Sequence, residues 1–425
     1  MQGRLAEISD FTAGAVRKFR RDLIICGVLA LIVGVGSFYL TGKTAPILLN
    51  ENDVWFGADT QRVFHDMSEA GARHYRAKVH PLFVLLTQPI VALLHAATGL
   101  GLPHAVRLLN ALFAAVWISL LFALLRILGC RRLDATLFTL LAAVSASAIF
   151  WLSVIETYVL GSISILSALI SVELVSRWKR PALWMAIVSA FTLSVTVTNW
   201  MTGLLATVVS FGARRALVVT MSAFCLVAVL WGVQKLAYPS CKFFLGAWEE
   251  GHYINSRLAG GPLRSVRSII FHTVVMPTVP RKNDQISEIY PVAYLTAQPA
   301  PVTNGSSLQL ASRACWLLLL GMGAAGVCIA LQKRSKICIA LAGTLAGQIF
   351  LHSIYGDEIF LYSLHWAPLL VAVAALGTLT RFRPAVLVVT AALILTAGVN
   401  NFSQLSIAIK SLPEQSALKA KYFGQ

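Results

Sequence analysis

The feature that most constrains this chain is a series of apolar runs that approach or reach the length needed to cross a lipid bilayer. A helix that spans the ~30 Å hydrocarbon core needs about 20 predominantly apolar residues. Eleven such runs lie at residues 23–41, 106–126, 134–153, 157–175, 182–199, 201–213, 216–236, 314–332, 337–353, 363–379 and 384–399. Only 12% of the 425 residues are charged, about half the share found in soluble domains. The sequence therefore predicts an all-α polytopic membrane protein with about 11 transmembrane helices, folded as a single membrane domain over residues 1–425.

Basic residues lie in short clusters between these runs, and the clusters orient the chain. They precede the first run and follow each later even-numbered run: Arg17, Lys18, Arg20, Arg21; Arg126, Arg131, Arg132; Arg177, Lys179, Arg180; Arg214, Arg215; Lys333, Arg334, Lys336; Arg381, Arg383. Cytoplasmic connections are enriched in Lys and Arg. We therefore expect a multi-pass protein of the inner cell membrane, with a cytoplasmic N-terminus and an extracytoplasmic C-terminus. The net charge of +17 follows this topology, so nucleic acid is not expected as a partner.

The apolar run at residues 81–98 breaks this alternation. Counted as a span, it would place the later basic clusters outside. Its length of about 18 residues, with internal Gln88 and Pro89, suits an amphipathic or half-inserted helix that stays on the outer side. Two long segments then face outward: a first extracytoplasmic loop at residues 42–105 with juxtamembrane helices, and a second at residues 237–312. Long ordered loops usually carry function.

The first outer loop contains a carboxylate-rich segment. Asp59, Arg62 and Asp66 would share one face of a helix that starts near Asp59. Asp59 then has two interpretations: a helix N-cap, a common role for Asp, or a functional carboxylate.

Cations follow where this loop meets the apolar run. The segment contains Arg73, His74, Arg76, Lys78 and His80. Such side chains can hold a lipid phosphate, or they can reach out to the membrane interface without a ligand. The sequence leaves both readings open.

Two further outer turns carry acidic residues. Glu156 lies between the third and fourth runs, where a carboxylate is costly unless it meets water, a cation or a substrate. The segment between the ninth and tenth runs contains His352, Asp357, Glu358 and His365. An aromatic interface belt would explain the Tyr and Trp residues of that segment but not these four.

Signatures of soluble nucleotide chemistry are missing. The sequence contains no P-loop, Rossmann fingerprint, HExxH or GxSxG motif. Its seven cysteines show no CxxC spacing, which argues against a disulfide framework or structural zinc site. No cofactor is therefore assigned, although a divalent metal is compatible with the carboxylates.

Five short motifs occur in a distinctive order: Asp59; His80-Pro81-Leu82; Ala105-Val106-Arg107-Leu108; Gly129-Cys130-Arg131-Arg132-Leu133; Glu156. This order resembles the GT-C superfamily of polyprenyl-phosphate-sugar-dependent glycosyltransferases, near its dolichyl-phosphate-mannose and aminoarabinose transferase branch. The resemblance covers roughly residues 20–215. That family also keeps the helix corresponding to residues 81–98 outside the membrane core.

The resemblance implies a GT-C-like fold and transfer of a sugar from a polyprenyl-phosphate donor to a lipid, glycan or protein acceptor on the extracytoplasmic face. It implies Asp59 as the catalytic base. The side chains expected to bind substrate are Arg62, Asp66, Lys78, His80, Glu156, Arg264, Arg267, Asp357, Glu358 and His365. The sugar and the acceptor stay open.

The second outer loop combines Arg264, Arg267, Arg281 and Lys282 with the apolar residues 269–271. We expect the apolar residues to dock on the membrane surface and the basic residues to hold the donor phosphate or to meet anionic lipid head groups. A transporter or lipid flippase is the alternative function. Against it, the apolar runs contain few ionisable residues and no paired discontinuous helices. A non-catalytic subunit of an envelope-assembly complex is a third hypothesis.

Overall fold

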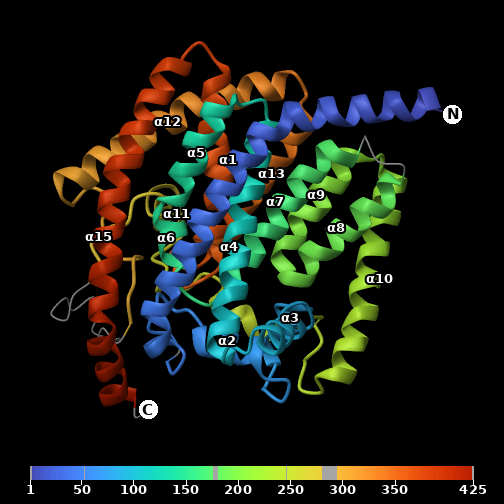
Figure 1. Cartoon of the computed structure of the whole chain (residues 1–425). Coiled ribbons are helices and arrows are strands. Elements are labelled where there is room, and N and C mark those ends of the chain that lie inside the picture. Colours follow the sequence, from blue (N-terminus) through green and yellow to red (C-terminus); the bar gives the residue numbers. More distant parts are fainter. Residues whose placement is uncertain (1, 52, 176–179, 246, 280–293, 424–425) are drawn as a thin grey trace.

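The computed structural model describes residues 2–51, 53–175, 180–245, 247–279 and 294–423 (Figure 1). Within these ranges every regular element is a helix, and η denotes a 3₁₀ helix. In chain order they are α1 (Gln2–Leu48), α2 (Thr60–Ser68), η1 (Tyr75–Lys78), α3 (Phe83–Thr98), α4 (Leu102–Ile127), α5 (Arg132–Ala143), α6 (Ala146–Trp151), α7 (Tyr158–Leu174), α8 (Pro181–Val195), η3 (Val197–Asn199), α9 (Trp200–Ser210), α10 (Ala213–Ala237), η4 (Ala247–Tyr253), α11 (Pro262–Phe271), α12 (Ser307–Gln332), α13 (Lys336–Ile354), η5 (Ile359–Tyr362), α14 (Ser363–Ala375), η6 (Leu376–Leu379) and α15 (Arg383–Phe423).

Seven helical segments in the described part of the chain are long and apolar enough to cross a membrane. They are Arg20–Leu48, Leu102–Ile127, Ala213–Ala237, Ser307–Gln332, Lys336–Ile354, Ile359–Leu379 and Arg383–Leu418. This confirms an all-helical membrane protein with several spans. The other four predicted runs form shorter helices, namely α5 with α6, α7, α8 and α9, so the predicted count of about 11 stays a prediction.

The run predicted over residues 134–153 is interrupted between α5 and α6. Ser145 caps α6, because its Oγ accepts the backbone N–H of Ala148 at 3.3 Å. The N–H groups of Ala146 and Ser147 donate to the carbonyls of residues 274 and 273 in the second outer loop, at 3.1 and 3.0 Å. Non-helical backbone inside a membrane protein is tolerated where other protein groups satisfy it. The inserted loop therefore explains why one apolar run forms two helices.

Three connecting segments that the charge pattern places on one side of the membrane do pack together. Trp55 of the first loop forms an isolated bridge with Leu295 of the second. Ile254 of the second loop bridges to Tyr355, directly after α13. In Figure 1, α2 and α3 lie at the end of the bundle where α15 finishes, whereas α1 begins at the opposite end. That both long loops lie on the extracytoplasmic face stays a prediction.

A tight turn directly precedes Asp59. Phe56 and Gly57 both have positive φ, at 51° and 72°, a region that non-glycine residues rarely adopt. The Phe56 ring is held by Phe360 and Phe150, at centroid distances of 5.2 and 5.6 Å. This buried aromatic contact stabilises the strained turn and fixes where the following carboxylate lies.

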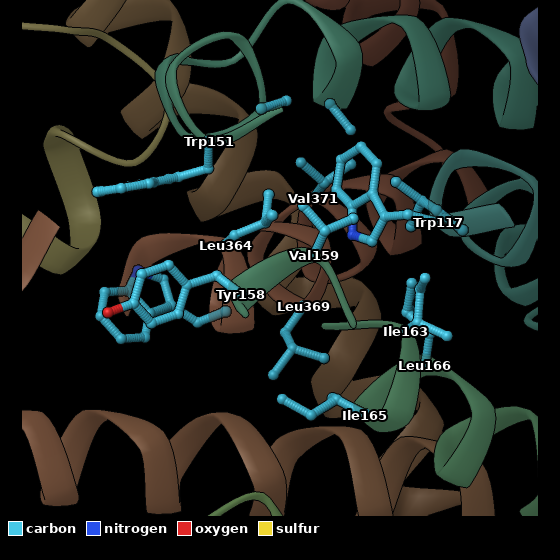
Figure 2. Packing of buried hydrophobic residues seen from close by; sticks show 14 of the residues in the cluster. Trp117, Trp151, Tyr158, Val159, Ile163, Ile165, Leu166, Leu364, Leu369 and Val371 are labelled. Carbon is cyan, nitrogen blue, oxygen red and sulfur yellow. The ribbon is translucent and has the colours of Figure 1, made fainter. Parts of the chain in front are cut away.

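The same aromatic cluster joins α6, α7 and η5. The Trp151 ring packs edge-on against Tyr158 with 5.3 Å between centroids, and its Nε1–H donates to the carbonyl of Phe360 at 3.0 Å. Figure 2 shows these two labelled side chains in the same buried cluster as Leu364 and Leu369 of α14. All of them are buried, so α6, α7, η5 and α14 share one packed core next to the outer loops.

Among residues 269–271, the expectation of docking on the membrane surface is wrong for Ile269, whereas Ile270 and Phe271 are half-buried. Ile269 is 1% exposed and belongs to the protein core. The following segment, Val274 to Met276, is fully buried, and the Met276 N–H donates to Oδ1 of Asn401 on α15 at 2.8 Å. Backbone hydrogen bonds to α6 and α15 draw this stretch into the protein, a contact that a linear sequence pattern does not reveal.

The orientation of the bundle can be tested with single cysteines in a background without the seven native ones. Ala70→Cys and Asn304→Cys, which place thiols on exposed outer segments, are expected to react with an impermeant maleimide in intact cells. Lys333→Cys, after α12, is expected to stay unlabelled because basic clusters mark the cytoplasmic face. Labelling at position 333 before cell lysis would reverse the predicted orientation.

Candidate functional site

A cavity of about 620 Å³ lies where the outer segments meet. Its wall contains six of the residues predicted to form a site: Asp59, His80, Arg264, Asp357, Glu358 and His365. It also contains Arg76 and His352, which the sequence pattern had offered as candidates. Residues that sequence reasoning did not single out as site residues are present too, among them Asp53, Tyr158, Tyr253, Arg257, Tyr355 and Tyr362. Residues far apart in the chain therefore converge on one polar chamber.

Asp59 stands at the N-cap position of α2 but does not cap the helix. Its carboxylate accepts no backbone N–H of α2. Instead Oδ2 accepts the Nε–H of Arg62 at 3.0 Å, and the side chain is 31% exposed. The helix-cap interpretation is correct for the backbone position and wrong for the side chain, which is left accessible at the cavity wall.

Arg62 bridges two carboxylates. Its Nη1 reaches Asp66 Oδ2 at 2.8 Å, and Asp66 also accepts from Nδ1 of the buried His74 at 2.7 Å. Burial lowers the pKa of the Arg62 guanidinium, but the carboxylates of Asp59 and Asp66 more than offset this, so its pKa lies above the ordinary value. Asp66 and Arg62 do not line the cavity; they fix the position of Asp59.

Glu156 holds the other side of Asp59. Its Oε1 accepts the backbone N–H of Asp59 at 3.1 Å, and its Oε2 accepts the hydroxyl of Thr157 at 3.1 Å. Burial raises the pKa of the Glu156 carboxyl, and the nearby Arg62 only partly opposes the rise. Glu156 is 5% exposed and lies outside the cavity wall. Its predicted role in binding substrate therefore stays a prediction, whereas its contact with Asp59 is direct.

The juxtamembrane cations are tied to the second outer loop. Arg76 Nη1 and Lys78 Nζ both contact Glu250 Oε1, at 2.7 and 3.1 Å. Lys78 is buried and does not line the cavity, whereas Arg76 does. These pairings argue against side chains that simply reach out to the membrane interface. The sequence analysis did not predict Glu250. Its position as an acidic residue in a predominantly basic loop is the signal that could have indicated it.

His80 presents a hydrogen-bond acceptor to the cavity. Its Nδ1 lies 2.9 Å from the carbonyl of Val195, so the proton is on Nδ1 because a carbonyl can only accept. Burial, together with Arg62 and Arg76, lowers the pKa of His80 well below its usual value. A neutral ring protonated on Nδ1 has its lone pair on Nε2, which can accept a hydrogen bond from a ligand hydroxyl.

The floor of the cavity is aromatic and contains two buried histidines. His352 stacks on Tyr362 with 4.5 Å between centroids, and His365 lies edge-on to Tyr158 at 5.6 Å. Nδ1 of His352 and Nε2 of His365 have no hydrogen-bond partner in the described part of the chain. Gly161 permits the close approach, since a Cβ there would lie 2.5 Å from His365 Nε2. Buried polar atoms usually have partners, so the floor is prepared for a polar ligand or water.

Glu358 organises one wall. Its carboxylate accepts the Thr296 hydroxyl and the backbone N–H groups of Ala297 and Gln298, both at 3.2 Å. Burial raises the pKa of Glu358 to about 7, although these hydrogen bonds oppose the rise. The wall therefore carries a carboxyl group that titrates near neutrality.

This raised pKa predicts a pH-dependent stability. A raised folded-state pKa means that the stabilising contribution is full below the unfolded value near 4.5 and is lost as pH rises through about 7. Between about pH 5 and pH 8 the protein should lose at most about 3 kcal/mol through this group. In Glu358→Gln, which resembles the neutral acid, thermal unfolding in detergent should depend less on pH. Identical pH profiles for the variant and the wild type would contradict the assignment.

The predicted basic residues of the second outer loop line this cavity, lie beside it or fall outside the described residues. Arg264 lines it, whereas Arg267 lines a smaller neighbouring pocket. Arg281 and Lys282 lie outside the described residues. No three His, Cys, Asp or Glu side chains come together as a metal site among the residues that could be searched. The Asp59 carboxylate is already paired with Arg62, so the described residues do not fit the divalent metal that the carboxylates suggested.

The fold and the cavity define a class: an all-helical membrane protein with several spans and a polar chamber under packed loops at one end. No known family model matches the chain, and no curated protein matches it in sequence. The crystal structure of the Archaeoglobus fulgidus oligosaccharyltransferase in the apo form is similar to it, with a TM-score of 0.46 and 13% sequence identity. The match covers 89% of this chain and 56% of that chain, so the chain spans little more than half the length of that protein.

Proposed function

We propose that the chain is a membrane glycosyltransferase that moves a sugar from a polyprenyl-phosphate donor to an acceptor hydroxyl on the extracytoplasmic face. The observation that carries the proposal is the accessible Asp59 carboxylate at the wall of a polar cavity. Arg62 orients its side chain and Glu156 holds its backbone. A general base needs this combination of access and fixed geometry.

Asp59 serves as the base. The acceptor oxygen forms a bond to the anomeric carbon while the bond from that carbon to the phosphate oxygen breaks. The lipid phosphate leaves with the electron pair, and the acceptor proton passes to the Asp59 carboxylate. Developing charge on the leaving phosphate requires cations, because it is otherwise poorly stabilised at the membrane edge.

Different surfaces of the cavity suit the phosphate and the sugar of the donor. Arg76, Arg257 and Arg264 supply positive charge at its wall. The aromatic and histidine floor suits an uncharged sugar ring. The aromatic rings can pack against the apolar faces of the sugar, and the histidine nitrogens that have no partner in the described part of the chain can form hydrogen bonds with its hydroxyl groups. The Nε2 of His80 can accept a further hydroxyl.

A radiolabelled donor series tests the proposal without knowledge of the acceptor. The purified protein is incubated with polyprenyl-phosphate sugars, and release of free sugar to water is measured beside transfer to added lipid and glycan acceptors. We expect at least one donor to be consumed. Intact donor under all conditions would argue against the proposed activity.

A further inference from the structure

Charged and uncharged residues of the main cavity come from different parts of the chain. Among the described residues, the acids and arginines of the wall are Asp53, Asp59, Arg76, Arg257, Arg264, Asp357 and Glu358. Each of them lies in an outer loop, in η1, in α11 or in the turn after α13. The residues that α7, α13, η5 and α14 contribute are Tyr158, His352, Leu361, Tyr362 and His365. The charges therefore belong to the outer wall, whereas the floor contains no acid, lysine or arginine among the described residues.

The two histidines of the floor are neutral. His352 and His365 are each 3% exposed, and the histidine ion pairs in the described part of the chain are those of His65 and His74. A protonated ring at the floor would be a buried charge without a counter-ion, which is strongly unfavourable. A neutral imidazole has one nitrogen that donates and one that accepts. Both rings can therefore exchange hydrogen bonds with hydroxyl groups, which also donate and accept.

Uncharged polar groups continue from the floor along α13. Thr344, Gln348 and His352 follow one another at intervals of four residues, which places them on one face of this helix. The Thr344 hydroxyl and both amide atoms of Gln348 are buried without a hydrogen-bond partner in the described part of the chain. The helix packs against α9, where the buried hydroxyl of Thr202 also has no partner among the described residues. The surroundings of the floor are thus polar and uncharged.

Gly161 of α7 sets the position of the His365 ring. A Cβ at residue 161 would lie 2.5 Å from Nε2 of His365 and 3.1 Å from Nδ2 of Asn199. Nδ2 of Asn199 donates to the Gly161 carbonyl at 3.2 Å, and its Oδ1 is buried without a partner among the described residues. Only a residue without a side chain lets the ring lie here, so a substitution at position 161 would move His365.

We propose that His352 and His365 select the sugar of the donor, and that they select a neutral sugar, plain or N-acetylated, against amino sugars and uronic acids. This inference rests on the proposed function. Hydroxyl groups of the sugar bond to the two neutral rings, and the stacked pair of His352 and Tyr362 supports one of its faces. An ammonium or carboxylate group at the floor would be buried without a counter-ion. The amino sugar of one transferase branch that the sequence resembles is therefore excluded.

A matched series of donors tests this selection by binding alone. Citronellyl phosphate carries glucose, N-acetylglucosamine, glucosamine or glucuronic acid, and a second series carries the corresponding galactose derivatives. Each donor is titrated calorimetrically into the full chain in neutral detergent. Within a series, the glucosamine-type and uronic acid donors should bind with a Kd about 10-fold or more above that of the neutral donors, because a buried charge would lack a partner. This comparison uses the wild type and needs no turnover.

Three variants assign the selection to the floor. His352→Asp supplies a carboxylate, so it should reduce or reverse the preference for glucose over glucosamine. His365→Phe keeps a ring but loses its nitrogens, so the Kd of the neutral donors should rise about 3–10-fold. Gly161→Ala, which displaces His365, should act in the same direction. Arg214→Ala, at an exposed arginine at the start of α10, should change none of the Kd values, and thermal unfolding shows which variants are folded.

The outcomes separate this inference from the proposed function. Equal or tighter binding of the amino-sugar donors in the wild type would overturn the selection, leave the proposed function intact and indicate a wall carboxylate such as Asp357 as the partner of the amine. Absence of binding by every donor would overturn the proposed function, and this inference with it. A folded His352→Asp variant with the wild-type order of Kd values would contradict the role of His352.

Discussion

The Asp59→Asn variant is expected to lose sugar transfer by about 10²–10⁴-fold in kcat, the usual contribution of a general base. The amide keeps the shape of the side chain and can still accept from Arg62 Nε, which lies 3.0 Å from the carboxylate. It cannot take a proton from the acceptor hydroxyl. Donor consumption by purified wild type and variant, under saturating donor, measures the effect.

Glu69→Gln is the matched control for this substitution. Glu69 is the C-cap of the same helix, is exposed and, in the described part of the chain, forms an ion pair with His65. Neutralising it should therefore leave both kcat and expression unchanged. Asp59→Asn should also keep its thermal stability, because the residue is accessible. Wild-type turnover by the Asn variant would contradict the assignment of Asp59 as general base and would leave it a purely structural role at the start of α2.

The largest effect on stability is expected for Arg62→Ala. Its side chain is 11% exposed and pairs with Asp66, which is 5% exposed. Truncation leaves a buried carboxylate with His74 as its remaining close partner. Removing one member of a buried ion pair costs roughly 3–5 kcal/mol, so thermal unfolding in detergent should begin at a clearly lower temperature than in the wild type.

Two further variants separate charge from packing. Arg62→Ala combined with Asp66→Asn should recover part of the lost stability, because the unpaired charge is removed. Arg73→Ala, at an exposed neighbouring arginine, should behave like the wild type. If Arg62→Ala unfolds at the wild-type temperature, the two-carboxylate bridge does not stabilise the first outer loop.

The spans could be predicted because bilayer thickness dictates the length and apolarity of a crossing helix. The interruption of residues 134–153 could not, since it depends on carbonyl groups 126 and 128 residues away that accept from α6. For the same reason the sequence suggested a membrane-docking role for Ile269, which long-range packing buries instead.

The site was partly predictable. The unusual position of acidic residues in outer turns indicated Asp59, Asp357 and Glu358, and these do line one cavity. Periodicity also indicated that Arg62 and Asp66 share a face, and they form a pair. Which of these side chains face the cavity could not be predicted. That depends on Glu250 and other second-loop residues, whose contacts are set by tertiary packing.

The central claim is covalent transfer of a sugar from a lipid phosphate, and one reconstitution measures it. Proteoliposomes containing the chain receive a polyprenyl-phosphate sugar labelled in the sugar, and the products are separated by linkage. The account predicts label in a new glycoside or in free sugar, with release of polyprenyl phosphate, and loss of both in Asp59→Asn. Donor that crosses the bilayer with its sugar–phosphate bond intact, equally in wild type and variant, would contradict the account and favour a lipid flippase.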